Sequence, residues 1–187
     1  MWEKFNQSLA VSILNYILDD KKNIVSSEHI EVLCYGLLSI LSEGEKILLL
    51  LLIFSFMHLS IAFIGSFLIL ISIRIFAGGS HRNTMTGCFL QSLVIMGGII
   101  FLSNQINAMP WILCVVAVGL GAVIMKKAPI VSKKRGSYSE KRKIVFRKRA
   151  LFFVILWTII GIVVGGIWAS RILCCLLVQL IEMCIVT

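Results

Sequence analysis

The sequence predicts an all-α, polytopic integral membrane protein with about four to six membrane segments and an amphipathic interfacial helix before them. Composition carries the first part of this prediction, because 59% of the 187 residues are hydrophobic and only 14% are charged. The apolar residues also gather into runs long enough to cross a bilayer. The length suits a single domain over residues 1–187.

The N-terminal stretch, residues 1–22, places apolar residues at helical spacing among polar ones. The apolar positions are Trp2, Phe5, Leu9, Ile13 and Tyr16. This pattern predicts an amphipathic helix over 2–18 that lies in the membrane interface, and a polar turn at 19–23 ends it. A short apolar segment follows at 30–41. Either it crosses the membrane, with the polar residues 42–45 outside, or the N-terminus is itself external, and we favour the first arrangement.

The longest apolar run covers residues 47–73 and is interrupted mainly by His58. It exceeds the roughly 20 residues that a membrane-spanning helix needs, so we expect one continuous span. An ionisable residue in mid-span is a candidate functional residue. The alternative that we favour for His58 is a neutral imidazole hydrogen-bonded to a neighbouring helix.

Residues 89–102 and 111–125 predict two further spans, joined by an uncharged connection at 103–110. The sequence Ser137-Tyr138-Ser139-Glu140 has the form of a capping box, which predicts a helix that starts there and runs through Trp157 into the membrane.

Gly161 and Gly165 would give that helix a surface of small residues for close packing, and we expect this surface to support a homodimer. Residues 172–186 form the last predicted membrane segment.

The net charge of +9 is concentrated in a basic segment, residues 126–149, which holds eleven Lys and Arg against the single Glu140. Basic loops between spans mark the cytoplasmic side, so this pattern indicates orientation and contact with membrane lipids rather than nucleic-acid binding. The uncharged connection at 103–110 then lies outside. We expect a multi-pass membrane protein, and the family resemblance described below implies that the membrane is the bacterial cell membrane.

The cysteines do not have the spacing of a disulfide framework or of a metal site. Five of the six lie within apolar segments, where we expect them to be buried packing residues: Cys34, Cys114, Cys174, Cys175 and Cys184. No metal and no other cofactor is predicted. The sixth, Cys88, stands in a different setting.

Cys88 closes a polar, glycine-rich island, residues 74–88, between two apolar runs. A cysteine becomes a strong nucleophile as its thiolate, and His81 lies seven residues upstream as a candidate base. On one unbroken helix seven residues separate the two by about 10.5 Å, too far for proton transfer, so the helix must break between them. Gly78 and Gly79 permit such a break, and Thr84 or Thr86 is a suitable cap for the next helix.

Cys88 would then lie in the first turn of that helix, where the helix dipole and free amide hydrogens favour a thiolate and an oxyanion. The alternative is an interfacial loop in which Cys88 only packs. No acidic residue lies between Glu45 and Glu140. Ser80, Asn83 and Gln91 remain candidates to orient His81, and the prediction is a catalytic dyad.

The pattern Arg74-x-x-Ala-Gly-Gly-x-His81, followed by Cys88 and by a downstream Lys-Ala-Pro and basic segment, resembles the AgrB family of membrane cysteine endopeptidases. That resemblance implies Cys88 as nucleophile and His81 as general base and acid, with Arg74, Gly78 and Gly79 as supporting residues. It also implies an AgrD-like quorum-sensing propeptide as substrate. Its acidic C-terminal tail is released, and the acyl group is captured as a macrocyclic thiolactone or lactone.

Two interpretations remain beside this one. A small membrane transporter or exporter component would use His58, Arg74 and His81 to line a path. A non-catalytic subunit would leave the Gly-Gly-x-His pattern without a role.

The basic segment carries a further prediction, because a basic surface on the side of the dyad would attract the acidic tail that the resemblance implies. The residues predicted to bind it are Lys133, Lys134, Arg135, Lys141, Arg142 and Lys143. The alternative is a solvated topology signal that touches anionic lipid.

Overall fold

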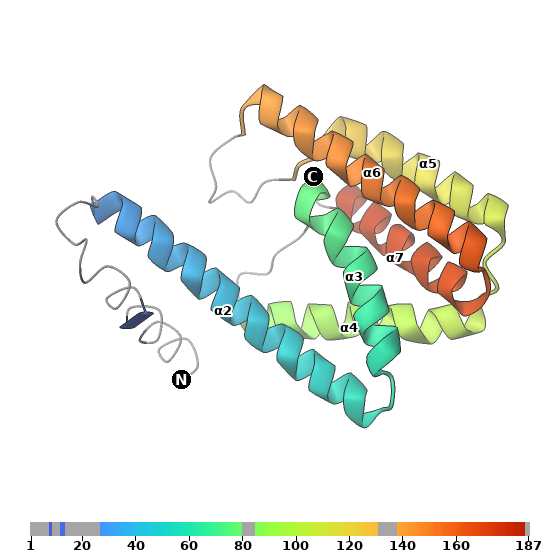
Figure 1. The fold of residues 1–187 in the computed structure, drawn as a ribbon, viewed down its shortest axis with the longest axis horizontal. Helices are drawn as coiled ribbons and strands as arrows, with labels where there is room; N and C mark the ends of the chain where they lie inside the picture. The colour runs from blue at the N-terminus through green and yellow to red at the C-terminus, as the bar shows by residue number, and fades with distance from the viewer. Residues whose placement is uncertain (1–7, 9–11, 14–26, 80–84, 131–137, 186–187) are drawn as a thin grey trace. The chain divides into compact units, whose positions relative to one another are not determined.

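The computed structural model describes residues 8, 12–13, 27–79, 85–130 and 138–185, and every element in these ranges is helical. The helices are α2 (Ser27–Phe56), α3 (Ser60–Ala77), α4 (Met85–Gln105), α5 (Pro110–Lys127), α6 (Glu140–Val164) and α7 (Gly166–Ile185). The predicted fold class is confirmed (Figure 1). The interfacial helix expected over residues 2–18 falls almost entirely outside the described residues.

The chain divides into two compact units, residues 1–56 and 57–187. The described part of the first unit is mainly α2, a single helix of 30 residues. The prediction of a separate short segment at 30–41 was therefore wrong, because residues 30–45 all belong to this one helix. Glu43 and Lys46 form an i,i+3 ion pair on the helix, and such pairs stabilise a helical backbone through a polar stretch.

The predicted continuous span over 47–73 was also wrong, because the helix breaks at residues 57–59. His58 adopts a left-handed backbone conformation, with φ 57°, and its side chain is exposed. Helix α3 resumes at Ser60, and its 18 residues reach about 27 Å, close to the thickness of the hydrocarbon core. His58 is thus in a turn between helices and not at the middle of a span.

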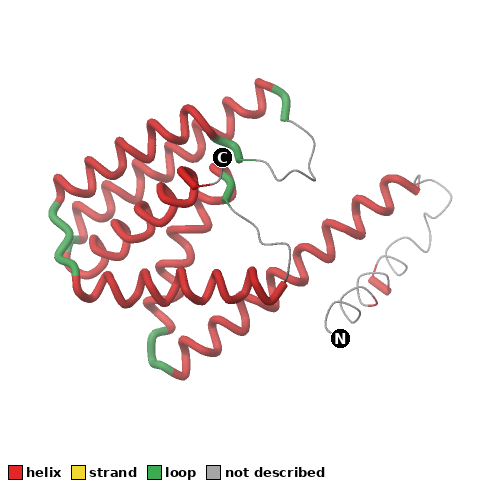
Figure 2. Tube along the Cα trace, turned by 180° about the vertical axis from the view of Figure 1, so that it is seen from behind, coloured by secondary structure: helices red, strands yellow, loops and turns green. Residues whose placement is uncertain are grey.

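In the second unit, helix α7 packs against α3, α4, α5 and α6. Helices α5, α6 and α7 lie close to one another with nearly aligned axes, while α3 crosses them, as the two opposite views show (Figures 1 and 2). Every residue from Ala169 to Leu176 is buried. The core of this unit is therefore built around its last helix.

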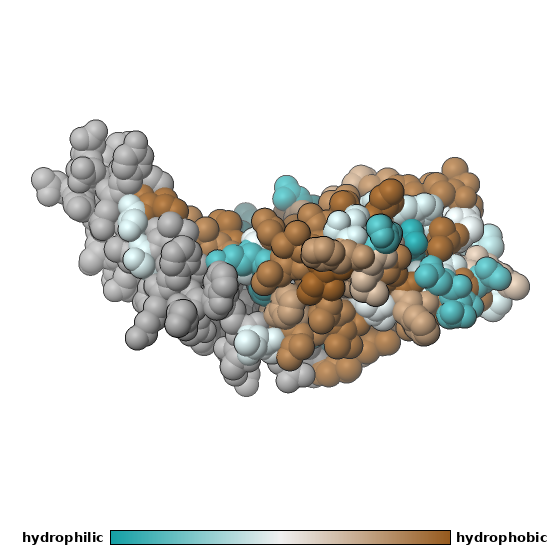
Figure 3. Space-filling view, turned by 90° about the horizontal axis from the view of Figure 1, so that it is seen from below, coloured by the Kyte–Doolittle hydropathy of each residue, from teal (hydrophilic) through white to brown (hydrophobic). Residues whose placement is uncertain are grey.

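Four helices within the described ranges are long and apolar enough to cross a membrane, at Ser60–Ala77, Thr86–Gln105, Pro110–Lys127 and Gly166–Ile185. Helix α6 is excluded by its charged first half, although its second half is apolar. Large apolar side chains cover much of the surface, including Leu68, Val118 and Phe152, and most of the described surface in Figure 3 is hydrophobic. This is the surface of a protein that resides in a lipid bilayer.

Helix α6 begins two residues later than the capping box predicted. Its N-cap is Ser139, without a side-chain cap hydrogen bond, and Ser137 lies outside the described residues. Glu140 is the first helical residue and accepts a hydrogen bond from Lys143 Nζ at 2.8 Å. The predicted capping box is therefore wrong, because Glu140 pairs forward along the helix.

The helix ends before Gly165, which has φ 65° and separates α6 from α7. Gly165 is thus not part of a helical surface of small residues, contrary to the prediction. Gly161 does allow close packing, but within the chain. A Cβ atom there would lie 3.3 Å from side-chain atoms of both Leu113 and Ile172.

The expectation for the cysteines holds only in part. Cys174 and Cys175 are buried in α7, whereas Cys114 and Cys184 are exposed. An apolar run in a membrane protein predicts burial from water, and that includes positions that face lipid. The side chain of Cys34 lies outside the described ones.

Candidate active site

Helix α3 ends where the sequence predicted a break. Its C-cap is Gly78, whose φ of 85° is a conformation that glycine adopts readily and other residues rarely do. A Cβ atom at Gly78 would lie 2.5 Å from the carbonyl oxygen of Ile130. The backbone of residues 77–78 can therefore pass close to the α5–α6 connection, where Ile130 N donates to Ala77 O at 3.0 Å.

The buried side chain of Gln179 on α7 fixes the same turn. Its Nε2 donates to the carbonyl oxygen of Gly78 at 3.0 Å. Gly79 also has no room for a side chain, since a Cβ atom there would lie 2.5 Å from Nε of Arg74. Both glycines of the motif are thus explained by close contacts at the end of α3.

Arg74, in the last turn of α3, binds a carboxylate instead of extending to the lipid headgroups. Its Nη2 lies 3.1 Å from Oε1 of Glu182, whose side chain is 9% exposed. Gln91 Nε2 donates to the same oxygen at 3.4 Å. Glu182 therefore joins the end of α3, the start of α4 and the last turn of α7.

Cys88 lies in the first turn of α4 and is half-buried, as the predicted break requires. Gln91 follows it by three residues, so both are on one side of the helix about one turn apart. The N-terminus of a helix presents unpaired amide hydrogens and a positive potential, which stabilise a thiolate and an oxyanion. His81, Ser80 and Asn83 lie outside the described residues, and the geometry of the predicted dyad with them.

The α5–α6 connection and the C-terminal turns of α7 lie at this same end of the bundle, which we call the island end. Arg147 Nε donates to Ala128 O at 2.7 Å, and Lys127 Nζ donates to Met183 O at 3.2 Å. Phe76, two residues before Gly78, stacks on Phe153 of α6 with ring centroids 5.7 Å apart. The basic start of α6 is therefore held close to the island.

Three of the six predicted tail-binding residues are described. Lys141 and Arg142 are exposed, and the Arg142 guanidinium lies 5.7 Å from the Tyr138 ring centroid. Lys143 is half-buried beside Glu140, and its hydrogen bond lowers the pKa of the Glu140 carboxyl. Lys133, Lys134 and Arg135 lie outside the described residues.

Glu182 was not predicted from the sequence as a site residue, because it lies far along the chain from the island. A signal for it was present. An acidic residue inside an apolar segment is costly in a membrane and points to a specific partner. No group of three His, Cys, Asp or Glu suited to a metal occurs in the described part of the chain.

The sequence model of the accessory gene regulator B family matches residues 10–187, nearly the whole chain. The chain belongs to the AgrB family. Membership connects it to the processing of propeptides in agr-type quorum sensing and implies an AgrD-type propeptide as partner. No curated protein and no solved structure matches the chain. The AgrB resemblance seen in the island thus extends over the four membrane-spanning helices and α6.

Proposed function

We propose that this AgrB-family protein is a cysteine endopeptidase that cleaves an AgrD-type propeptide, with Cys88 as nucleophile and His81 as general base and acid. The observation that carries the proposal is the position of Cys88 in the first turn of α4, beside the cluster of Arg74, Gln91 and Glu182. Because the family processes propeptides, we expect a propeptide to be the substrate that this thiol attacks.

In the proposed reaction His81 takes the proton of the Cys88 thiol, and Sγ attacks the scissile carbonyl carbon. Amide hydrogens at the start of α4 stabilise the oxyanion of the tetrahedral intermediate. His81 returns the proton to the leaving amine, and the acidic tail departs. A nucleophilic side chain of the peptide then attacks the thioester, which frees Cys88 and closes a thiolactone or lactone ring.

Arg74, Gly78 and Gly79 act as supporting residues in this scheme. Arg74 is held by Glu182, and the two glycines allow the chain to leave α3 close to Arg74 and Ile130. Their role is to set the path on which the island enters α4. Enzymes lose rate steeply when a reacting group is displaced by about 1 Å, so such support has catalytic consequences.

We place this end of the bundle in the cytoplasm. The basic segment supports the assignment, because positively charged loops face the cytoplasm. The second turn of α6 lies beside the end of α3, where the ring centroids of Phe146 and Phe76 are 6.2 Å apart. A reducing cytosol also keeps Cys88 as a thiol.

One experiment tests both the activity and its position at the island end of the bundle. The purified protein is reconstituted into vesicles, and a synthetic AgrD-type propeptide is added to the outside. Mass spectrometry should find the tail and the cyclic product where the island end faces outward, and intact propeptide where it faces the lumen. Intact propeptide with either orientation of the protein in the vesicles would contradict the activity. Cleavage only where the island end faces the lumen would contradict the position of the active site but not the activity.

The basic residues at the start of α6 should matter for substrate binding. Replacing Lys141, Arg142 and Lys143 with glutamine should raise KM, because these residues would bind the acidic tail. The kcat should change little, because this contact is distant from the scissile bond. The effect should shrink with added salt, since exposed charges are screened within about 8 to 10 Å at physiological ionic strength. Cleavage rates measured at two salt concentrations decide this, and an unchanged KM at low salt would contradict tail binding.

A further inference from the structure

Arg171 is a buried cation at the other end of the bundle, far from the island. It is the sixth residue of α7, about 8 Å along the helix from Gly166, and only 8% of its surface is exposed. Nearby, Ala108 N donates to Ser170 Oγ at 3.1 Å, so the α4–α5 connection lies at this end. Arg171 is therefore within side-chain reach of one membrane surface.

No carboxylate of this unit is available to Arg171. Between residues 57 and 187 the only acidic side chains are Glu140 and Glu182. Glu182 pairs with Arg74, Glu140 pairs with Lys143, and both pairs lie at the island end. Among the described residues, the buried Nε of Arg171 has no hydrogen-bond acceptor. A buried guanidinium without an anion is costly in a membrane, which favours an anionic partner from outside the described residues of this unit.

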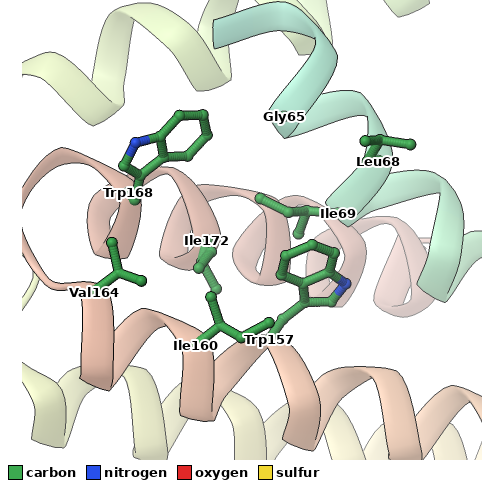
Figure 4. Close-up of a pocket in the computed structure, with 8 residues that line it drawn as sticks. All are labelled: Gly65, Leu68, Ile69, Trp157, Ile160, Val164, Trp168 and Ile172. Carbon is green, nitrogen blue, oxygen red and sulfur yellow. The ribbon is translucent and has the colours of Figure 1, made fainter. Parts of the chain in front are cut away.

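Arg171 contacts one wall of an apolar pocket, the ring of Trp168. The guanidinium lies 4.6 Å from the ring centroid of Trp168, and that ring lines a cavity of about 320 Å³ between α3, α6 and α7. In Figure 4 the rings of Trp168 and Trp157 stand on either side of Ile172. The cavity is partly open and its lining is almost entirely apolar.

Specific contacts hold both indoles in place. Trp157 Nε1 donates to Ser72 Oγ at 2.8 Å. Trp168 fits against α3 because Gly65 has no side chain, since a Cβ atom there would lie 2.4 Å from the ring. The walls of the pocket are thus fixed by the fold, as expected of a preformed binding site.

We propose that Arg171 and this pocket form a binding site for an anionic phospholipid, with the phosphate on Arg171 and an acyl chain between Trp157 and Trp168. A guanidinium is well suited to phosphate oxygens. A methylene group occupies a volume close to the ~30 Å³ of a water molecule, so the cavity accommodates roughly ten. The surrounding medium supplies such chains, and the site does not depend on the proposed catalytic activity.

The test is a titration of the purified protein with phosphatidylglycerol in a neutral detergent, with bound lipid counted by native mass spectrometry. Arg171→Gln should weaken binding about tenfold, because it removes a charge-assisted contact with the phosphate. Arg149→Gln is the matched control. Arg149 also stands over an aromatic ring, that of Phe76 at 5.7 Å, but it is exposed at the island end. Equal losses in the two variants would contradict the site.

Two further ligands test whether the phosphate bound by Arg171 belongs to a lipid headgroup or is a free anion. A phosphate-free diacyl glycolipid with the same chains should bind the wild type no better than it binds Arg171→Gln. Millimolar inorganic phosphate should not displace phosphatidylglycerol. Displacement by inorganic phosphate would indicate a free-anion site, and a preference for an AgrD-type propeptide that depends on Arg171 would indicate a peptide site. Either result would overturn the lipid assignment.

A variant in the pocket keeps the proposal testable if Arg171→Gln does not fold. Ile160→Phe partly fills the cavity and leaves the charge in place. With phosphatidylglycerol that carries a photoreactive group in its acyl chain, the wild type should be labelled on α6 and α7 next to the two tryptophans. Ile160→Phe should lose most of this label. Labelling spread evenly over the lipid-facing helices in both proteins would rule out a specific site.

Discussion

Replacing Cys88 with alanine should reduce propeptide cleavage to the background rate, a loss of at least roughly 10⁴-fold in kcat, because no other group can form the acyl-enzyme. His81→Ala should be nearly as severe, since the thiol then lacks its base. Cleavage in vesicles, measured by mass spectrometry of the released tail, gives both rates. Tail release by the Cys88→Ala protein would eliminate the proposed mechanism.

The matched control replaces the other five cysteines together, with alanine at the buried Cys174 and Cys175 and serine elsewhere. This protein should retain activity, because the other thiols have no part in the proposed reaction. It also offers a single thiol to an alkylating reagent. The rate of inactivation should equal the rate at which Cys88 is modified, and inactivation without modification of Cys88 would point to another nucleophile.

Glu182→Gln should have the second-largest effect. The substitution keeps the shape of the side chain but leaves the Arg74 guanidinium, 3.1 Å away, without its counter-charge. Removing one partner of a buried pair costs about 3 to 5 kcal/mol, and the partial exposure of Arg74 places our expectation nearer 2 kcal/mol. We also expect kcat to fall about 100-fold with little change in KM. The reason is that the ends of α3 and α4 would no longer be held together, so the Cys88 thiol would be less precisely positioned.

Two comparisons separate positioning from general destabilisation. Glu140→Gln removes the acid of an exposed ion pair and should leave the free energy of unfolding nearly unchanged. The double variant Arg74→Gln, Glu182→Gln removes both charges and should recover most of the lost stability. If it recovers kcat as well, the pair acts only through position. A stable but inactive double variant would mean that Arg74 itself contacts the substrate, and unchanged kcat in Glu182→Gln would contradict the positioning role.

The sequence was most informative where local chemistry decides the backbone. Gly78 and Gly79 predicted the end of α3, and the position of Cys88 in the first turn of α4 followed from that break. The sequence-based prediction failed at residues 47–73, where the helix breaks. Hydropathy indicates whether a residue prefers lipid or water, but it does not indicate where a helix ends. No glycine or proline marks the turn at His58.

Long-range partners were beyond local reasoning for a different reason. Apart from a few residues such as Arg171, Gln179 and Glu182, α7 is apolar, and its sequence does not indicate which neighbour each side packs against. The pairing of Arg74 with Glu182 depends on the order of helices in the bundle, as does the contact of Gln179 with Gly78. Neither can be read from spacing along the chain.

The central position of α7 bears on how the protein is made. Arg74 and Glu182 are 108 residues apart, and α7 is synthesised after α3, α4, α5 and α6. Until it inserts, α3, α4, α5 and α6 lack their shared neighbour, Gly78 lacks the amide of Gln179, and Arg74 lacks its carboxylate. Contacts between distant parts of a chain form slowly, so the four earlier helices must wait in the membrane with these groups unsatisfied. The order of synthesis thus makes the island end the last part of the bundle to be completed.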